Sequence, residues 1–299
     1  MALVTEPRLE GTFRVAEHRR ISFAEYGDPH GRVVFWFHGT PGGRRQIAPL
    51  THGIATDLGV RLIVLERPGI GFSTPHVYRN VLGWADDVGT IADALGEERF
   101  AAVGLSGGGP YVLACAARFP DRMVAGGVLG GVAPTRGPEA VSGGAVGLAR
   151  RFAPLLEIGR RPLGDGLHRL LRLLVPLQSP VFDLYVALSP EGDKQVFRQP
   201  EMKRMFIDSM VRSTRKQAHA PVIDLVLFTR DWGFSLKDLR VPIRFWHGDA
   251  DHIVPLAHVH HMMRLVPDAE LRVRHGESHM GALDASEEIF KTLLALWPA

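Results

Sequence analysis

The feature that most constrains this chain is a serine between glycines, placed directly after an apolar run. Residues 104–108 read Gly-Leu-Ser-Gly-Gly, a G-x-S-x-G motif, and residues 99–103 have the length and composition of a buried strand. A serine on a sharp turn between a strand and a helix has its hydroxyl pushed out above the sheet. The flanking glycines are needed because neighbouring atoms would otherwise collide at the turn. The sequence therefore predicts a strained backbone at Ser106 and an exposed hydroxyl group that points out above the sheet.

A phosphate-binding role for the same turn is the weaker interpretation. Residues 107–109 are glycines that open a helix after a strand, but no G-K-[ST] follows them and no G-x-G-x-x-G fingerprint is present. The G-x-S-x-G pattern also occurs by chance in many chains. The choice between these interpretations therefore depends on partners elsewhere in the sequence.

Two later loops offer such partners for the serine. Residues 241–246 read as a short strand that runs into an acidic loop with Asp249 and Asp251. Residues 271–274 alternate as a strand should and lead into a loop with His275 and His279. An acid and a histidine are thus both expected in loops that follow strands.

The order serine, acid, histidine resembles that of the α/β-hydrolase superfamily, and the resemblance covers nearly the whole chain. In the family pattern G-x-x-D-x-x-V-P, counted from Gly248, the acid is Asp251 rather than Asp249. In the terminal pattern G-x-x-H, counted from Gly276, the histidine is His279, and His275 has the lesser claim.

The resemblance also implies an oxyanion hole. Residues 33–37 read as a strand, and the His-Gly-Thr-Pro that follows resembles the H-G-x-P loop of the family. The backbone N–H groups of Thr40 and Gly107 would then stabilise the negative charge that develops during acyl transfer. We expect His38 to hold this loop by hydrogen bonding, since it lies on the wrong loop to act as the base.

The fold implied by the resemblance is a mostly parallel eight-stranded sheet flanked by helices, with a helical cap inserted after strand 6. Residues 1–133 and 241–299 would form the core domain and residues 134–240 the cap, because the βα rhythm stops between residues 133 and 240. A stripe at helical spacing is expected to pack mostly onto the main domain, with some apolar surface left toward the pocket; its members are Leu167, Leu170, Leu171, Leu174 and Val175.

Composition sets further limits. The single cysteine, Cys115, excludes an internal disulfide and lies in an apolar segment, where we expect an inert core residue. No charged start with an apolar h-region and no uninterrupted apolar span of about 20 residues is found, which predicts a cytoplasmic protein. His258 and His261 are one helical turn apart with His260 beside them, but cysteines and a suitable carboxylate pattern are lacking nearby. A solvated helix face is expected there, with neither metal nor organic cofactor.

Charge is distributed unevenly along the chain. Residues 134–240 contain 17 Lys and Arg against 11 Asp and Glu, whereas the whole chain has a net charge of only +3. A basic cap could steer anionic substrates or rest on an anionic membrane surface, but we favour a solvated basic face. No nucleic-acid motif is present.

These residues and the resemblance together predict a cofactor-free serine hydrolase that cleaves a carboxylic ester with an apolar acyl part, through an acyl-enzyme on Ser106. A lactone or thioester would suit the same site. Non-heme haloperoxidases or perhydrolases, carbon–carbon bond hydrolases and aminopeptidases resemble it on the same triad. A ligand-binding receptor on a hydrolase fold is the alternative of a different class. The sequence leaves the oligomeric state open.

Overall fold

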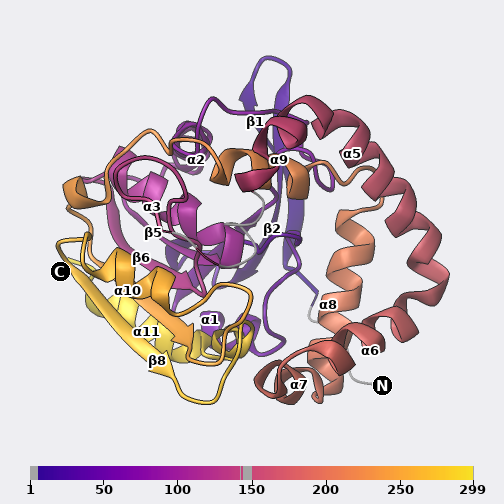
Figure 1. The fold of residues 1–299 in the computed structure, drawn as a ribbon. Coiled ribbons are helices and arrows are strands. Elements are labelled where there is room, and N and C mark those ends of the chain that lie inside the picture. Colours follow the sequence, from indigo (N-terminus) through magenta and orange to yellow (C-terminus); the bar gives the residue numbers. More distant parts are fainter. Residues whose placement is uncertain (1–5, 142, 144–149, 299) are drawn as a thin grey trace.

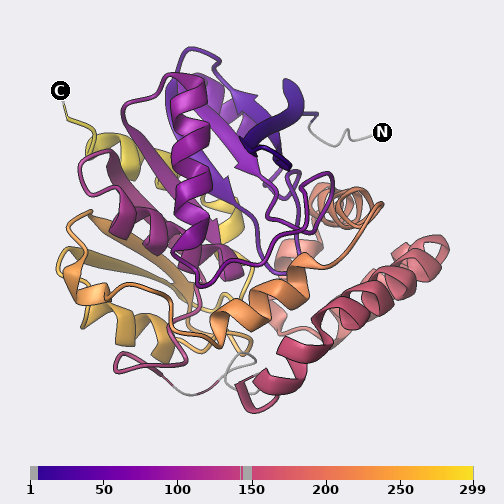
Figure 2. The ribbon, with the colours of Figure 1, turned by 90° about the horizontal axis from the view of Figure 1, so that it is seen from above.

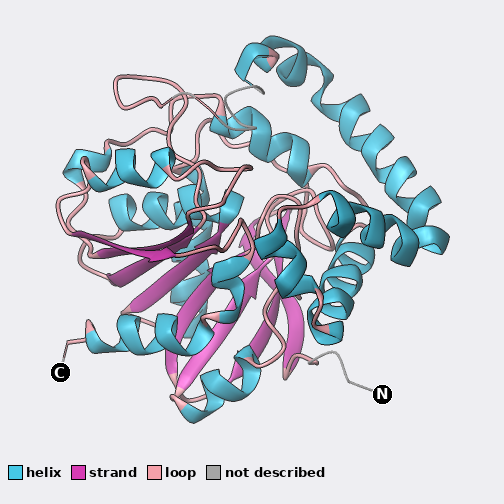
Figure 3. Cartoon of the chain, turned by 60° about the horizontal axis from the view of Figure 1, so that its bottom comes forward, coloured by secondary structure: helices cyan, strands magenta, loops and turns pink. Residues whose placement is uncertain are grey.

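The computed structural model describes residues 6–141, 143 and 150–298, and its centre is one eight-stranded sheet. The strand order is β1-β2-β4-β3-β5-β6-β7-β8, with β2 antiparallel to both of its neighbours and the remaining pairs parallel. Figure 3 shows the strands side by side with helices on both faces. The predicted mostly parallel sheet is therefore confirmed. The strands are β1 (Leu9–Ala16), β2 (Arg19–Gly27), β3 (Arg32–Phe37), β4 (Val60–Leu65), β5 (Phe100–Leu105), β6 (Met123–Leu129), β7 (Ile243–Gly248) and β8 (Ala269–Arg274).

The central strands are apolar along their whole length because both of their faces are covered. Residues 33–37 of β3 and all of β5 are buried, as expected for parallel strands between two layers of helices. The edge strand β1 instead alternates between exposed and half-buried side chains. Burial thus falls from the centre of the sheet toward this edge.

Helices pack on both faces of the sheet. One face carries α2 (Gly83–Leu95), α3 (Gly109–Arg118) and α10 (Ala257–Met263), and the other carries α1 (Thr51–Asp57) and α11 (Ser286–Ala295). Helix α2 ends at a left-handed glycine, Gly96. The two apolar cores therefore lie above and below one sheet.

Two strands begin later than the sequence predicted. The strand expected at residues 99–103 is β5, which starts at Phe100 and continues to Leu105. The strand expected at residues 241–246 is β7, which starts at Ile243 and continues to Gly248. Pro242 has no N–H to donate, so the pairing of β7 with β8 begins one residue later, where the Ile243 N–H bonds to the carbonyl of Asp268.

The chain between β6 and β7 forms a group of helices that we call the inserted helices. These are α5 (Ala153–Leu174), α6 (Gln178–Leu188), α7 (Glu191–Phe197), α8 (Pro200–Ser213) and α9 (Ala220–Phe228), with a short 3-10 turn between α5 and α6. Figures 1 and 2 show them to one side of the sheet, with α5 along the outer edge of the molecule.

The inserted helices include one long segment that is apolar on average. Within the described chain, the segment Ala153–Leu188 is long and apolar enough to cross a membrane by length and composition, with a mean hydropathy of 1.3 in its most apolar window. Only 6% of that window is buried, so the segment is not a core helix of the protein.

Candidate active site

Ser106 sits on the turn between β5 and α3, as the motif predicted. Its φ is +52°, the only positive value at a non-glycine residue among those described, which marks backbone strain. A Cβ on Gly104 would lie 2.4 Å from the carbonyl oxygen of Gly108, so the turn closes only with glycine there. The serine is 8% exposed, and the prediction of an exposed hydroxyl is wrong, because Ser106 forms part of the wall of a cavity shared with the inserted helices.

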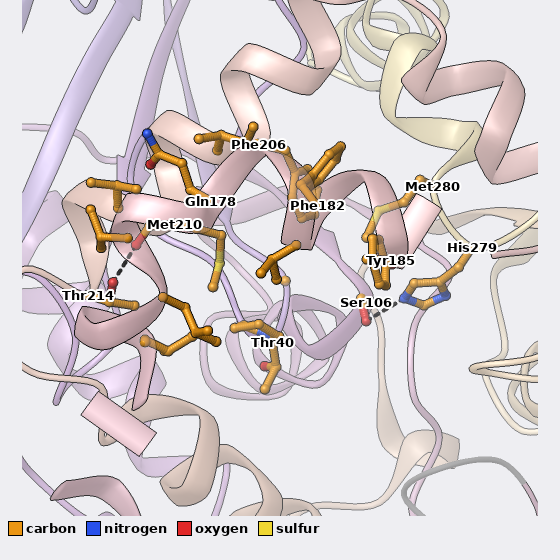
Figure 4. Close-up of a pocket in the computed structure, with 18 of the residues that line it drawn as sticks. Thr40, Ser106, Gln178, Phe182, Tyr185, Phe206, Met210, Thr214, His279 and Met280 are labelled. Atoms are coloured by element: carbon orange, nitrogen blue, oxygen red, sulfur yellow. Dashed lines mark hydrogen bonds between the residues drawn. The ribbon is translucent and has the colours of Figure 1, made fainter. Parts of the chain in front are cut away.

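The structure joins Ser106, His279 and Asp251 by two hydrogen bonds. Nε2 of His279 lies 2.8 Å from Oγ of Ser106, and Nδ1 lies 2.7 Å from Oδ2 of Asp251. The first of these bonds is visible in Figure 4. The three side chains come from the ends of β5, β7 and β8, where carboxyl ends of parallel strands meet. With these distances, His279 can accept a proton from the serine while Asp251 stabilises the resulting charge.

Asp251 is held as an anion. Burial opposes its ionisation, but hydrogen bonds from His247 and His279 outweigh that cost and lower the pKa of the carboxyl well below its usual value. The N–H groups of Ile253 and Val254 each donate to Oδ1 at 2.8 Å. Nε2 of His247 lies 3.4 Å from Oδ2, farther than its 2.8 Å bond to the Val254 carbonyl, so His279 is the closer imidazole partner of the carboxylate.

The two residues with the lesser claim pair with each other on the surface. Nδ1 of His275 lies 2.9 Å from Oδ2 of Asp249, and the histidine side chain is 84% exposed. The Gly276 N–H also donates to Asp249, at 2.8 Å. Asp249 therefore organises the loop that follows β8, and its hydrogen bonds go to that loop rather than to His279.

Thr40 and Gly107, the predicted oxyanion-hole residues, lie against one another. A Cβ on Gly107 would be 2.2 Å from Oγ1 of Thr40, which explains why glycine follows the serine. Oγ1 of Thr40 donates to the carboxylate of Asp224 at 2.5 Å and accepts from Arg67 at 2.9 Å. The side chain of Thr40 is thus fixed from behind, while Thr40 itself lines the cavity beside Ser106.

His38 holds the loop before Thr40. Its Nε2 accepts a hydrogen bond from the Arg67 N–H at 3.2 Å, so Nδ1 carries the proton and donates to the Gly39 carbonyl at 2.8 Å. Burial, together with the charge of Arg67, holds the pKa of His38 well below its usual value. His38 is therefore a neutral structural residue of this loop.

A cavity of about 390 Å³ opens above Ser106 and His279. Its walls come from the sheet loops and from α5, α6 and α8, and Figure 4 shows Phe182, Phe206 and Met210 among them. In the same view, Gln178 and Thr214 lie away from Ser106, toward the other end of the labelled lining. Among the described residues that line the cavity there is no Asp or Glu.

The leucine stripe of α5 has a different role from the one expected. Leu171, Leu174 and Val175 line the cavity, and Leu170 is 52% exposed. The expectation that most of this stripe packs onto the main domain is therefore wrong. Helical spacing identifies a shared face, but it does not identify what covers that face.

Comparison with known proteins identifies the family to which this chain belongs. A family model described as alpha/beta hydrolase fold matches residues 32–286. The chain belongs to the alpha/beta hydrolase family. The G-x-S-x-G turn, the loop with Asp251 and the loop with His279 all lie in the matched range. That range also includes every strand from β3 to β8.

The relatives of this hydrolase are named for different activities. A proline iminopeptidase from Neisseria meningitidis is 29% identical over 180 residues, and this match covers 56% of the chain and 57% of that enzyme's length. A bifunctional esterase/perhydrolase from Acinetobacter calcoaceticus is 26% identical over 287 residues, covering 92% and 95%. A thermophilic esterase from Thermogutta terrifontis has a similar structure, with a TM-score of 0.67 at 21% identity, covering 96% and 97%. At that identity the structural likeness shows the fold alone.

Two buried carboxylates of this hydrolase were not predicted from the sequence. Asp193, on α7, accepts hydrogen bonds from the Ser278 hydroxyl at 3.1 Å and from the Met280 N–H at 2.9 Å, one on each side of His279. Asp224, on α9, pairs with Arg67 at 2.7 Å. Neither lies in a motif, and both act over long sequence separations, so nothing in the local pattern points to them.

Asp224 completes a buried network behind Thr40. It accepts from the Tyr111 hydroxyl at 2.7 Å as well as from Arg67 and Thr40. The side chains of Arg67 and Asp224 are both 2% exposed. A buried ion pair with this many hydrogen bonds fixes the geometry of the groups it contacts.

The remaining candidate side chains are structural. Cys115 is buried on α3, and burial raises the pKa of its thiol far above the usual value. His258 is buried rather than solvated, which corrects the expectation for this helix: its Nδ1 accepts from the Ala133 N–H at 3.3 Å. His261 bonds to the Glu139 carbonyl at 2.8 Å. The imidazoles of α10 therefore anchor the chain that follows β6.

Proposed function

We propose that this hydrolase cleaves a carboxylic ester with an apolar acyl part, through an acyl-enzyme on Ser106. The observation that carries the proposal is the hydrogen-bonded series Ser106, His279, Asp251 in the wall of an apolar cavity. A strained serine with a histidine at 2.8 Å is an activated nucleophile, and an apolar cavity suits an uncharged acyl group.

Each step follows from what these groups can do. His279 accepts the hydroxyl proton as Oγ of Ser106 attacks the ester carbonyl carbon, and Asp251 stabilises the imidazolium. The N–H groups of Thr40 and Gly107 would hold the oxyanion, each contributing about 3 kcal/mol to transition-state stabilisation. His279 then returns the proton to the leaving alcohol. A water molecule, activated by the same histidine, hydrolyses the acyl-enzyme and regenerates Ser106.

The cavity limits the substrate. A volume of about 390 Å³ holds a small to medium acyl group, and its lining is made largely of aliphatic, aromatic and methionine side chains. The polar groups of Gln178 and Thr214 would meet the distal end of a longer substrate. A lactone or thioester of similar size would present the same carbonyl to Ser106.

Peptide cleavage is the second candidate, because several relatives are named proline iminopeptidases. A substrate with a protonated amine or imine in the cavity needs an anionic partner there to offset its desolvation. The described lining supplies no Asp or Glu for this purpose. We therefore rank the ester above the peptide.

The test is a direct comparison of the two substrate classes. Hydrolysis of p-nitrophenyl esters, from acetate to long acyl chains, is measured beside hydrolysis of proline p-nitroanilide, with Ser106→Ala as the control. Ester activity that depends on Ser106 and peaks at a defined chain length is the expected result. Faster turnover of the proline substrate would overturn the ranking. Absence of turnover on all of them, with the protein folded, would favour a ligand-binding receptor.

A further inference from the structure

The outer side of α5 and α6 presents several large apolar side chains to solvent. Its large side chains recur at helical spacing and are strongly exposed, up to 83% for Ile158, 74% for Leu173 and 80% for Leu188. We call this the outer apolar face; its main members are Leu155, Ile158, Leu170, Leu173, Leu184 and Leu188. Figures 1 and 2 show α5 along the edge of the molecule, where no other described element covers it. Large apolar side chains that gather on one exposed side of a protein are typical of an interaction site.

The face is separate from the cavity, although both use the same helices. Leu171, Leu174 and Val175 turn toward the cavity, and α5 also packs against α9. Rotating the helix to bury the outer apolar face would therefore expose the cavity lining. The helix is already packed on the protein through its other side. Its exposed side chains are therefore available to an external partner.

The charges around this face favour an anionic partner. Its acids are already paired: Glu157 with Arg160 and Arg230, Asp165 with His219, and Asp183 with Lys203. Four exposed arginines have no ion pair among the described residues; these are Arg151, Arg161, Arg169 and Arg172. These arginines suit the anionic headgroups of a bilayer surface, and the exposed leucines beside them suit its acyl chains.

We propose that the outer apolar face binds the surface of an anionic lipid bilayer, with α5 and α6 lying in the plane of the interface. The segment Ala153–Leu188 has the hydropathy of a spanning helix, but the charged residues of α5 and its cavity-lining side would be buried in lipid if it spanned. An interfacial position leaves both in suitable surroundings. It also brings the apolar cavity next to a bilayer, from which an apolar substrate could be drawn.

Binding to vesicles tests this proposal without any turnover. The full-length protein is sedimented with vesicles of phosphatidylcholine alone and with vesicles containing about one third phosphatidylglycerol. The apolar variant is Ile158→Gln with Leu173→Gln, and the basic variant is Arg161→Gln with Arg169→Gln and Arg172→Gln. The matched control is Leu50→Gln, because Leu50 is 76% exposed but lies at the start of α1 and is not part of the outer apolar face. All of these side chains are exposed, and melting temperatures establish that each variant folds.

The expected result is binding to the anionic vesicles that falls by about tenfold or more in the apolar and basic variants and is unchanged in the control. Binding by the basic variant should also lose its dependence on salt. Failure to bind anionic vesicles, or equal binding by all variants, would overturn the proposal. A dimer in sedimentation equilibrium that the apolar variant converts to a monomer would overturn it as well, since a second copy would then cover the face.

Discussion

The carboxylate of Asp193 accepts a hydrogen bond from the N–H of Met280 at 2.9 Å, which ties the inserted helices to the loop that carries His279. Asp193 is fully buried and also accepts a hydrogen bond from the Ser278 hydroxyl, so it holds this loop on both sides of His279. Burial raises the pKa of Asp193, against the opposing effect of its hydrogen bonds. His279 is therefore positioned by a helix that lies outside the sheet.

Replacing Asp193 should separate positioning from folding. In Asp193→Ala the two donors lose their acceptor, and we expect kcat to fall on the order of tenfold with little change in KM, because His279 is less well placed. Stability should fall by about 1–3 kcal/mol, since buried donors become unsatisfied. The matched control is Asp183→Ala on α6, whose exposed ion pair with Lys203 should contribute little. Unchanged kcat in Asp193→Ala, measured with any ester it turns over, would contradict the positioning role.

The two acids of the loop after β7 make a sharp comparison. Asp251→Asn removes the anion that faces His279, and kcat should fall on the order of 10⁴-fold. Asp249→Asn alters surface contacts with His275 and with the Gly276 N–H, neither of which involves His279, and kcat should stay within about twofold of wild type. Steady-state ester hydrolysis measures both, and a reversed order would mean that the wrong aspartate has been assigned.

The three residues joined by hydrogen bonds could be found from the sequence because each lies in a short motif that follows the end of a strand. In a parallel sheet these ends meet at one edge, so local patterns were enough to predict that Ser106, Asp251 and His279 come together. Asp193 and Asp224 could not be found in this way. Asp193 contacts Ser278 across 85 positions, and Asp224 contacts Arg67 across 157, without any motif around either acid.

The α5 stripe illustrates a second limit. Its periodicity was sufficient to predict a helix with an apolar side, but packing decides which apolar residues face a cavity and which face solvent. Leu171 lines the cavity, whereas Leu173, two positions away, is largely exposed. That distinction depends on α9, which packs against α5, and on α8, which lines the same cavity.

The buried ion pair of Arg67 and Asp224 should contribute strongly to the stability of the region around Thr40. In Asp224→Asn, Arg67 keeps a hydrogen-bonding neighbour but loses its counter-charge, and unfolding free energy should fall by about 3–5 kcal/mol. Asp86→Asn, which breaks an exposed pair with Arg118, should cost less than about 1 kcal/mol. Urea denaturation measures both variants. Equal effects would show that the buried network contributes no more than a surface contact.

His38 should make the protein less stable in mild acid. Its pKa is lowered in the folded state, so between that pKa and the ordinary value of about 6.5 the unfolded chain binds a proton that the folded chain does not. Stability is therefore full above about pH 6.5 and is lost as pH falls below it, by up to about 1.4 kcal/mol per pH unit from this group. In His38→Gln the decline between about pH 6 and 5 should be shallower by about 1 kcal/mol. A decline as steep as that of wild type would mean that other groups carry the effect.

The role of Ser106 as the nucleophile is tested by covalent labelling with a fluorophosphonate, with the labelled residue located by peptide mass spectrometry. We expect one adduct, on Ser106, that is absent in Ser106→Ala, forms far more slowly in His279→Ala, and is unchanged in Cys115→Ala. Labelling at another residue, or full labelling of Ser106→Ala, would contradict it.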